Sequence, residues 1–172
     1  MDVDALVNAV QTFNGPDALR VRFTPEQWRT FSQYLTPHRI RAGDLLIQQG
    51  DGDKAMYLVA EGSLHVFVAA PSSSDGKGHG DAGGPANMGG VASKVAILRA
   101  GAVVGEPSLF GDVKRMANAE AMTPCMVWAL RGPRLDEMAQ RSPMLATAFM
   151  RAAAGVMAVR MAAYVNQRVP MA

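Results

Sequence analysis

The stretch Val104–Ala121, VGEPSLFGDVKRMANAEA, decides the fold of this chain and carries its candidate chemistry. Gly105 and Glu106 end a short apolar run, and Pro107 is tolerated at the first position of a short helical turn. Arg115 follows after a tight turn and begins another candidate strand. The stretch therefore predicts a strand, one helical turn and a second strand, with charged side chains at both ends of the turn.

The residue types in this stretch suit a sugar phosphate. A helix N-terminus offers free backbone N–H groups and a positive dipole end, which favour an anion. The planar guanidinium of Arg115 can hold two phosphate oxygens at once. Glu106 would repel a phosphate, so we expect its carboxylate to face a hydroxyl. The alternative is a surface turn followed by a strand with an exposed arginine, because short motifs often match by chance.

The pattern of an apolar residue, Gly-Glu, any residue, a small residue and an apolar residue, followed after a spacer by Arg-x-Ala, resembles the phosphate-binding cassette of cyclic nucleotide-binding domains. The second half of the pattern is carried by alternating small positions: Arg115, Ala117, Ala119 and Ala121. An upstream pattern of the same family lies in residues 46–62, LIQQGDGDKAMYLVAEG. The two patterns are in the family's order, and the resemblance covers roughly residues 23–169.

The chain departs from the family pattern at a few positions. Asp53 stands where the family usually has a small residue. Met116 stands where a small or hydroxyl residue usually follows the arginine. Pro107 removes one backbone N–H from the turn, although the first N–H of a helix is the one least needed.

The resemblance assigns a role to each cassette residue. It implies that Glu106 accepts a hydrogen bond from the ribose 2′-hydroxyl and that Arg115 pairs with the cyclic phosphate. The Ser108 backbone N–H would donate to a phosphate oxygen. Gly105 would let the chain approach the sugar closely, and Ala117 would keep the pocket open.

The resemblance further implies a regulatory module that binds a purine 3′,5′-cyclic nucleotide and repositions its C-terminal helix. Because Met116 has no hydroxyl to hydrogen-bond phosphate or guanine, cyclic AMP is favoured, and cyclic GMP stays open. The alternative is a domain that no longer binds nucleotide. In that case Glu106 and Arg115 would form a retained internal ion pair, and the domain would act in dimerisation or protein docking.

The hydrophobic pattern predicts one α+β, mainly β domain over residues 1–172. Residues 1–36 read as N-terminal helices, and the period changes to two at residue 38. Short strands punctuated by glycine over 38–130 indicate an antiparallel β-roll or jelly roll, a double-stranded β-helix. The Gly- and Ser-rich residues 71–94 read as a flexible insertion. Residues 133–168 read as C-terminal helices.

Several local signals place these elements. An apolar stripe predicts a helix over residues 3–13. Thr24, Pro25 and Gln27 form a helix start with a capping box, and Thr36-Pro37 should end that helix. Residues 115–121 are expected to form one strand.

The last helix, predicted over residues 143–168, carries a second apolar seam. Its members repeat at alternating spacings of four and three: Leu145, Phe149, Ala152, Val156, Val159 and Ala163. We expect a homodimer through this helix, because it is apolar on more than one face. The alternative is that the seam packs only on its own roll.

Other function classes lack their residues. Three histidines lie far apart and Cys125 is the single cysteine, so no metal site, cofactor site or nucleophile–base pair is evident, and we expect no enzyme. A single cysteine cannot form an internal disulfide framework, which fits a reducing, cytoplasmic location. Cys125 lies in an apolar run, which indicates a buried thiol. The net charge of +2 is too small to indicate nucleic acid.

The termini favour a protein partner over a membrane or DNA. No secretory signal begins the sequence, and arginines interrupt the apolar residues 144–165, so a packed helix is expected rather than a membrane span. No helix-turn-helix is evident after the long helix, so DNA binding is not expected of this chain. The tail is loosely similar to cyclic nucleotide-binding-like domains of bacterial sulfate-permease-family transporters, which suggests a membrane transporter or another protein as partner.

Overall fold

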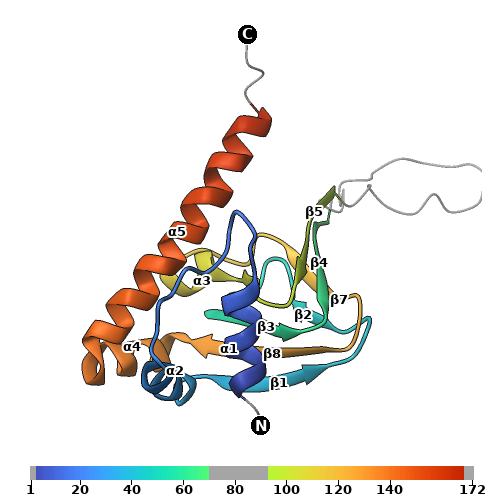
Figure 1. Ribbon diagram of the computed structural model, residues 1–172. Helices are drawn as coiled ribbons and strands as arrows, with labels where there is room; N and C mark the ends of the chain where they lie inside the picture. The colour runs from blue at the N-terminus through green and yellow to red at the C-terminus, as the bar shows by residue number, and fades with distance from the viewer. Residues whose placement is uncertain (1–2, 70–92, 169–172) are drawn as a thin grey trace, which may run out of the picture.

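The computed structural model describes residues 3–69 and 93–168. In these residues eight strands form two four-stranded antiparallel sheets, with helices at one side (Figure 1). The expected β-roll with N-terminal helices and a long C-terminal helix is confirmed. The elements are α1 (Val3–Thr12), α2 (Pro25–Ser32), β1 (Thr36–Ile40), β2 (Leu45–Ile47), β3 (Ala55–Glu61), β4 (Ser63–Val68), β5 (Ser93–Arg99), β6 (Val103–Val104), α3 (Glu106–Phe110), β7 (Asn118–Ala121), β8 (Cys125–Arg131), α4 (Gly132–Arg141) and α5 (Pro143–Arg168).

In the sheet of order β1-β8-β3-β6, the central strands β3 and β8 are buried on both faces. On β3, Met56 and Leu58 face the helices, whereas Tyr57 and Val59 face the second sheet, of order β2-β7-β4-β5. This double burial explains why β3 and β8 read as continuous apolar runs rather than as alternating strands. The roll therefore has one core between the sheets and another beneath the helices.

The helix signals of the N-terminal segment are confirmed. Thr24 accepts a hydrogen bond from the Gln27 backbone N–H, and the Gln27 side chain accepts one from the Thr24 N–H, which completes the capping box. Trp28 and Phe31 are buried on the inner face of α2. Phe31 packs against Phe149 of α5 at 5.0 Å between ring centroids, so the two ends of the chain share one core.

Two predicted boundaries differ in the structure. The Thr36-Pro37 pair does not lie in the turn after α2 but inside β1. Proline is tolerated there because β1 is the edge strand of its sheet. Strand β5 begins at Ser93, so the end of the segment expected to be a flexible insertion, 71–94, is part of a strand. Residues 71–92 of that segment lie outside the described residues.

The long helix α5 has two different halves. Its first half packs on the roll beside α2 and α4, and its second half runs beyond the roll (Figure 1). Of the predicted seam, Leu145, Phe149 and Val156 are buried in the protein's own core, whereas Val159 and Ala163 are exposed. Packing of the seam on its own roll thus accounts for the first half of the helix and not for the second.

Helix α5 also has the length and composition of a membrane span. Among the described residues it is the one helix that meets this test, over Pro143–Asn166, and 28% of the window is buried inside the protein. A core helix of a soluble protein passes the same test, and Phe149 at 0% exposure shows that α5 contributes to the core.

Candidate functional site

The cassette begins at a glycine that no other residue could replace without strain. Gly105 has a φ of +92°, and a Cβ placed there would lie 2.5 Å from Nη1 of Arg115 and 2.7 Å from the Ala55 carbonyl oxygen. Helix α3 follows at once, with Pro107 in its first turn as expected. The glycine thus permits both the turn and the close approach of the arginine side chain to the backbone.

Arg115 is buried beneath this turn. Its side chain is 3% exposed, its Nη1 donates to the Gly105 carbonyl at 3.2 Å, and its Nη2 donates to Asp53 at 2.9 Å. The guanidinium lies 5.9 Å from the ring centroid of Tyr57. The structure therefore brings Arg115 to the Gly105–Glu106 turn, which local spacing could not establish.

Arg115 does not begin a strand, contrary to the sequence prediction. Strand β7 starts only at Asn118, and its pairing with β2 contains a register shift between Leu45 and Ile47. The Arg115 backbone instead exchanges two hydrogen bonds with the turn after β2, from Gly50 N–H to Arg115 O at 2.8 Å and from Arg115 N–H to Asp51 O at 2.8 Å. This exchange fixes the arginine against the loop that carries Asp53.

Asp53, the residue that departs from the family pattern, is the acidic partner of Arg115. It lies in the exposed loop before β3, and its second oxygen accepts from Arg131 at 3.1 Å. The Tyr57 hydroxyl donates to Asp53 at 3.4 Å. Burial raises the pKa of Tyr57, and the negative charge of Asp53 raises this pKa further. Two arginines and one tyrosine thus converge on a single carboxylate.

Glu106 is buried at the other end of the turn, with its side chain 2% exposed. Its Oε1 accepts from Nη1 of Arg160, on α5, at 2.5 Å. Arg160 also donates to Val103 O at 2.9 Å and to Asp17 at 2.8 Å. Among the described residues no ion pair joins Glu106 to Arg115. The retained internal pair that we considered from the sequence is therefore absent there, and each residue has another partner.

The remaining cassette residues occupy different environments. Ser108 is buried at 3% exposure, whereas Met116 is 64% exposed and Ala117 is half-buried. Ala117, the smaller of the two residues that follow Arg115, is thus the more buried one, and Met116 lies at the surface.

Sequence reasoning missed Asp17 and Arg160 as site residues. Arg160 lies one position after the predicted seam residue Val159, and nothing in the local sequence indicates a partner for it. Asp17 lies in the loop after α1, and no local pattern relates it to a helix 143 residues away. Only the fold brings these residues to Glu106.

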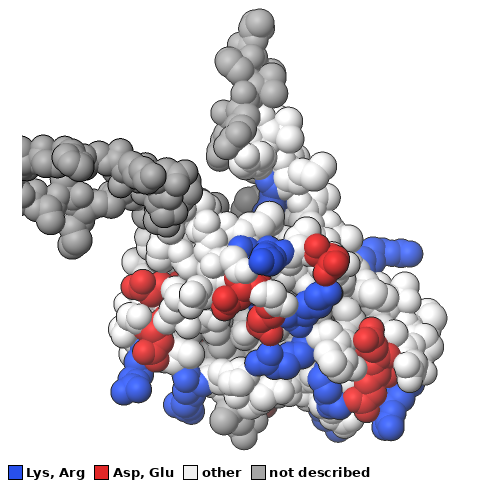
Figure 2. Space-filling view, turned by 180° about the vertical axis from the view of Figure 1, so that it is seen from behind, with Lys and Arg blue, Asp and Glu red and all other residues white. Residues whose placement is uncertain are grey.

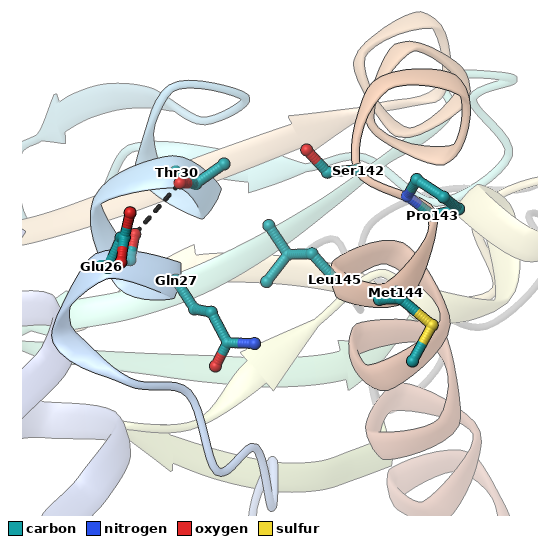
Figure 3. Close-up of a pocket in the computed structure, with 7 residues that line it drawn as sticks. All are labelled: Glu26, Gln27, Thr30, Ser142, Pro143, Met144 and Leu145. Atoms are coloured by element: carbon teal, nitrogen blue, oxygen red, sulfur yellow. Dashed lines mark hydrogen bonds between the residues drawn. The ribbon is translucent and has the colours of Figure 1, made fainter.

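A cavity of about 390 Å³ has no cassette residue in its lining (Figure 3). It lies between α2 and the start of α5, and its lining includes Glu26, Gln27, Ser142 and Met144. The Thr30 hydroxyl there donates to the Glu26 backbone oxygen at 3.0 Å, and Glu26 is the one charged residue in the lining. The cassette, which holds the buried charged residues Glu106 and Arg115, is therefore a better candidate for a ligand site than this cavity.

Surface charge and possible metal ligands add little to this site. On the face that Figure 2 shows, basic and acidic side chains are interspersed. The described part of the chain contains no cluster of three His, Cys, Asp or Glu side chains that could hold a metal ion. Cys125 is buried, as expected, and its thiol contacts the Thr123 carbonyl at 3.1 Å.

Comparison with known families supports the interpretation of the cassette. A family model, the cyclic nucleotide-binding domain, matches residues 86–142, which include the whole of the Val104–Ala121 stretch. No curated protein matches the chain. The family match confirms the resemblance that the sequence motifs indicated.

Solved structures share the fold at low sequence identity. A cyclic nucleotide-binding domain from Methylobacillus flagellatus KT gives a TM-score of 0.74 at 17% identity, over 99% of this chain and 85% of that one. The catabolite activator protein of Thermus thermophilus gives 0.69 at 23% identity, over 87% and 60%. The N-terminal domain of a Streptomyces coelicolor A3(2) transcriptional regulator gives 0.65 at 21% identity, over 95% and 97%. The chain has the fold of cyclic nucleotide-binding domains.

Proposed function

We propose that this chain, which has the fold and the cassette of cyclic nucleotide-binding domains, is a regulatory module that binds a purine 3′,5′-cyclic nucleotide. One observation carries the proposal: Arg115, 3% exposed, donates to the carbonyl of Gly105, the residue next to the buried Glu106. A phosphate-binding cation and a hydroxyl-binding carboxylate thus flank one turn, with a glycine between them that allows close approach.

Cyclic AMP is the favoured ligand. Met116 offers no hydroxyl for a guanine or phosphate, and its exposed thioether can contact a base only through apolar surface. Cyclic AMP needs the sugar and phosphate contacts of Glu106 and Arg115 and tolerates an apolar neighbour at its base. Met116→Thr should therefore improve binding of cyclic GMP more than binding of cyclic AMP.

The proposed response is a movement of the second half of α5. Arg160 connects this half to Glu106, so a ligand hydroxyl that engages Glu106 changes the environment of Arg160. A ligand shifts the position of the helix only if it binds one position better than the other. The Glu106–Arg160 contact exists only when α5 lies close to the roll, so a ligand bound at Glu106 would meet different surroundings in the two positions of the helix.

A second candidate function rests on the same ion pairs. Arg115 already has Asp53 as a partner, and Glu106 already has Arg160. A domain in which these pairs are permanent would bind no nucleotide and would act in dimerisation or protein docking. Because Asp53 lies on an exposed loop and is 40% exposed, its pairing with Arg115 can be exchanged for a ligand phosphate at little structural cost.

Isothermal titration calorimetry with cyclic AMP and cyclic GMP separates the two candidates. The ligand-binding module gives saturable heat with both nucleotides and a lower dissociation constant for cyclic AMP. The absence of both heat and thermal stabilisation at about millimolar ligand, a concentration at which even a weak complex forms, would leave the docking module.

We further propose that the protein is a cytoplasmic homodimer, assembled through the outer half of α5, and not an enzyme. Val159, Met161 and Val165 are exposed there, at 39%, 70% and 47%. A two-fold contact would place the same apolar residues against each other. Contact with another protein, such as a membrane transporter, is the competing use of this surface.

The outer half of α5 can be tested by one substitution at each end of the helix. Val156, which the sequence seam offered as a probe of the dimer, is 1% exposed in the protein's own core, so a charge there would damage the fold instead. Met161→Glu should give a monomer in light scattering, and Met144→Glu, at an 81% exposed position at the other end, should leave the dimer intact. A monomeric unmutated protein at high concentration would contradict the dimer.

A further inference from the structure

One arginine joins three distant segments of the chain at the sugar end of the cassette. Arg160 reaches from the outer half of α5 to Glu106 at the start of α3, to the Val103 carbonyl at the end of β6, and to Asp17 in the loop between α1 and α2. The contacts to Glu106 and Asp17 lie 54 and 143 residues from Arg160 in sequence. The N-terminal segment is therefore in polar contact with the cassette through a single side chain.

Asp17 binds the Arg160 guanidinium in a way that determines its orientation. Nε and Nη2 of Arg160 lie 2.8 and 2.7 Å from the same oxygen of Asp17, whereas Nη1 donates to Glu106 at 2.5 Å. A guanidinium is planar, so a pair of nitrogens held on one side fixes the direction of the third. Asp17 thereby sets the orientation in which Arg160 meets Glu106.

The orientation of Arg160 is important for Glu106 because the Glu106 side chain is deeply buried. The Glu106 side chain is 2% exposed, against 21% for Asp17 and 30% for Arg160. A carboxylate so deeply buried is costly unless a correctly placed cation and hydrogen bonds compensate for the water that it has lost. It also has acceptor capacity beyond its bond to one arginine nitrogen, which a ligand hydroxyl can use.

We propose that Asp17 is a positioning residue for the ribose-binding carboxylate: acting through Arg160, it holds Glu106 ready for the ligand 2′-hydroxyl. This inference rests on the proposed function and adds to it a residue that lies outside the cassette. It makes the loop between α1 and α2 part of the site, and it ties recognition of the sugar to the position of α5. Asp17 itself touches no ligand atom in this scheme.

The test compares two ligands that differ only in the group that Glu106 would bind, cyclic AMP and its 2′-deoxy analogue. The unmutated protein should prefer cyclic AMP by about tenfold or more, because the analogue leaves a buried charged acceptor without its hydroxyl. Asp17→Asn should narrow this preference by about threefold or more. An effect of this size is expected of a residue that contacts Glu106 only through Arg160. Asp17→Glu, which keeps the carboxylate, should retain most of the preference.

Two further variants keep the test decisive. Asp44→Asn removes an acidic partner, that of Arg41, from the turn between β1 and β2, outside the cassette, and should leave the preference unchanged. Arg160→Lys keeps the charge but lacks the planar fork, so it should narrow the preference even if Asp17→Asn fails to fold.

The outcomes separate this inference from the proposed function. If Asp17→Asn and Arg160→Lys weaken both ligands equally and leave their ratio unchanged, Asp17 serves stability only, and the positioning role is wrong while nucleotide binding stands. If the unmutated protein binds neither ligand, the proposed function fails and the positioning role fails with it.

Discussion

The two ends of the cassette are built in different ways. At the proposed phosphate end, Arg115 is paired with Asp53 from an exposed loop that also contacts it through the backbone. At the sugar end, Glu106 is paired with Arg160 from the last helix, which in turn binds Asp17 near the N-terminus. The first end is a local arrangement around one turn, and the second connects both ends of the chain.

This difference indicates a division of labour. We propose that the phosphate end exchanges an internal carboxylate for a ligand anion without disturbing the rest of the fold, so it should determine affinity. The sugar end cannot change its partners without affecting α5, so it should determine the response. The predictions that follow separate these two roles, beginning with the largest effect.

Removal of the phosphate partner should have the largest effect on affinity. Arg115→Ala leaves the ligand phosphate without its buried cation, and we expect cyclic AMP binding to weaken by about 100-fold or more in calorimetry. Arg131→Ala is the matched control, because Arg131 contacts the same Asp53 but is 47% exposed. Equal losses in the two variants would show that the buried position of Arg115 has no special role.

Removal of the sugar-end cation should act mainly on the helix. Arg160→Gln leaves Glu106 buried without its ion-pair partner, which should lower the free energy of unfolding by about 2 kcal/mol. Amide hydrogen exchange over residues 157–166 should become faster, because that half of α5 has few buried side chains of its own. Arg151→Gln, at an exposed position earlier in α5, should leave the exchange unchanged.

Loss of the competing carboxylate should have a smaller effect at the phosphate end. Asp53→Asn removes the anion that occupies Arg115, so cyclic AMP should bind about three- to tenfold more tightly, as expected for one partly exposed charge contact. Asp51→Asn, in the same exposed loop, is the control. Weaker binding by Asp53→Asn would mean that Asp53 supports Arg115 in the complex instead of competing with the ligand.

The smallest effect concerns the pH dependence of Tyr57. Burial, and then the charge of Asp53, raise the pKa of Tyr57 above its usual value of 10.0. Above about pH 10 the unfolded chain therefore ionises this tyrosine while the folded protein keeps it protonated, so the free energy of unfolding should fall as pH rises. In Tyr57→Phe the free energy of unfolding should fall less at alkaline pH. In Asp53→Asn the tyrosine should titrate at a lower pH, because the nearby negative charge is gone. An unchanged alkaline slope in Tyr57→Phe would contradict this assignment.

Local sequence signals were sufficient for much of the fold. The capping box at Thr24 depends on residues three positions apart, so the sequence shows it directly. The turn at Gly105–Glu106 was equally visible, since only glycine suits its positive φ. The position of Pro37 was not, because its tolerance depends on β1 being an edge strand, which is a property of the sheet.

The polar partners at the site could not be predicted from the sequence. Asp53 was noticed as a departure from the family pattern, but its pairing with Arg115 across 62 residues required the β-roll to be folded. The two acidic partners of Arg160 come from segments with no shared pattern. Ion pairs of this kind depend on where elements meet in space, and periodicity within one element does not specify that.

The central claim, that a cyclic nucleotide binds at this turn, is tested most directly by NMR titration of the isotope-labelled protein with cyclic AMP. We predict saturable shifts at the backbone amides of Gly105, Glu106 and Ser108 and at the Arg115 side chain, with smaller shifts at Arg160. The same titration of Arg115→Ala should need far more ligand. Saturation at another surface, or no shift in these residues at millimolar ligand, would contradict the account.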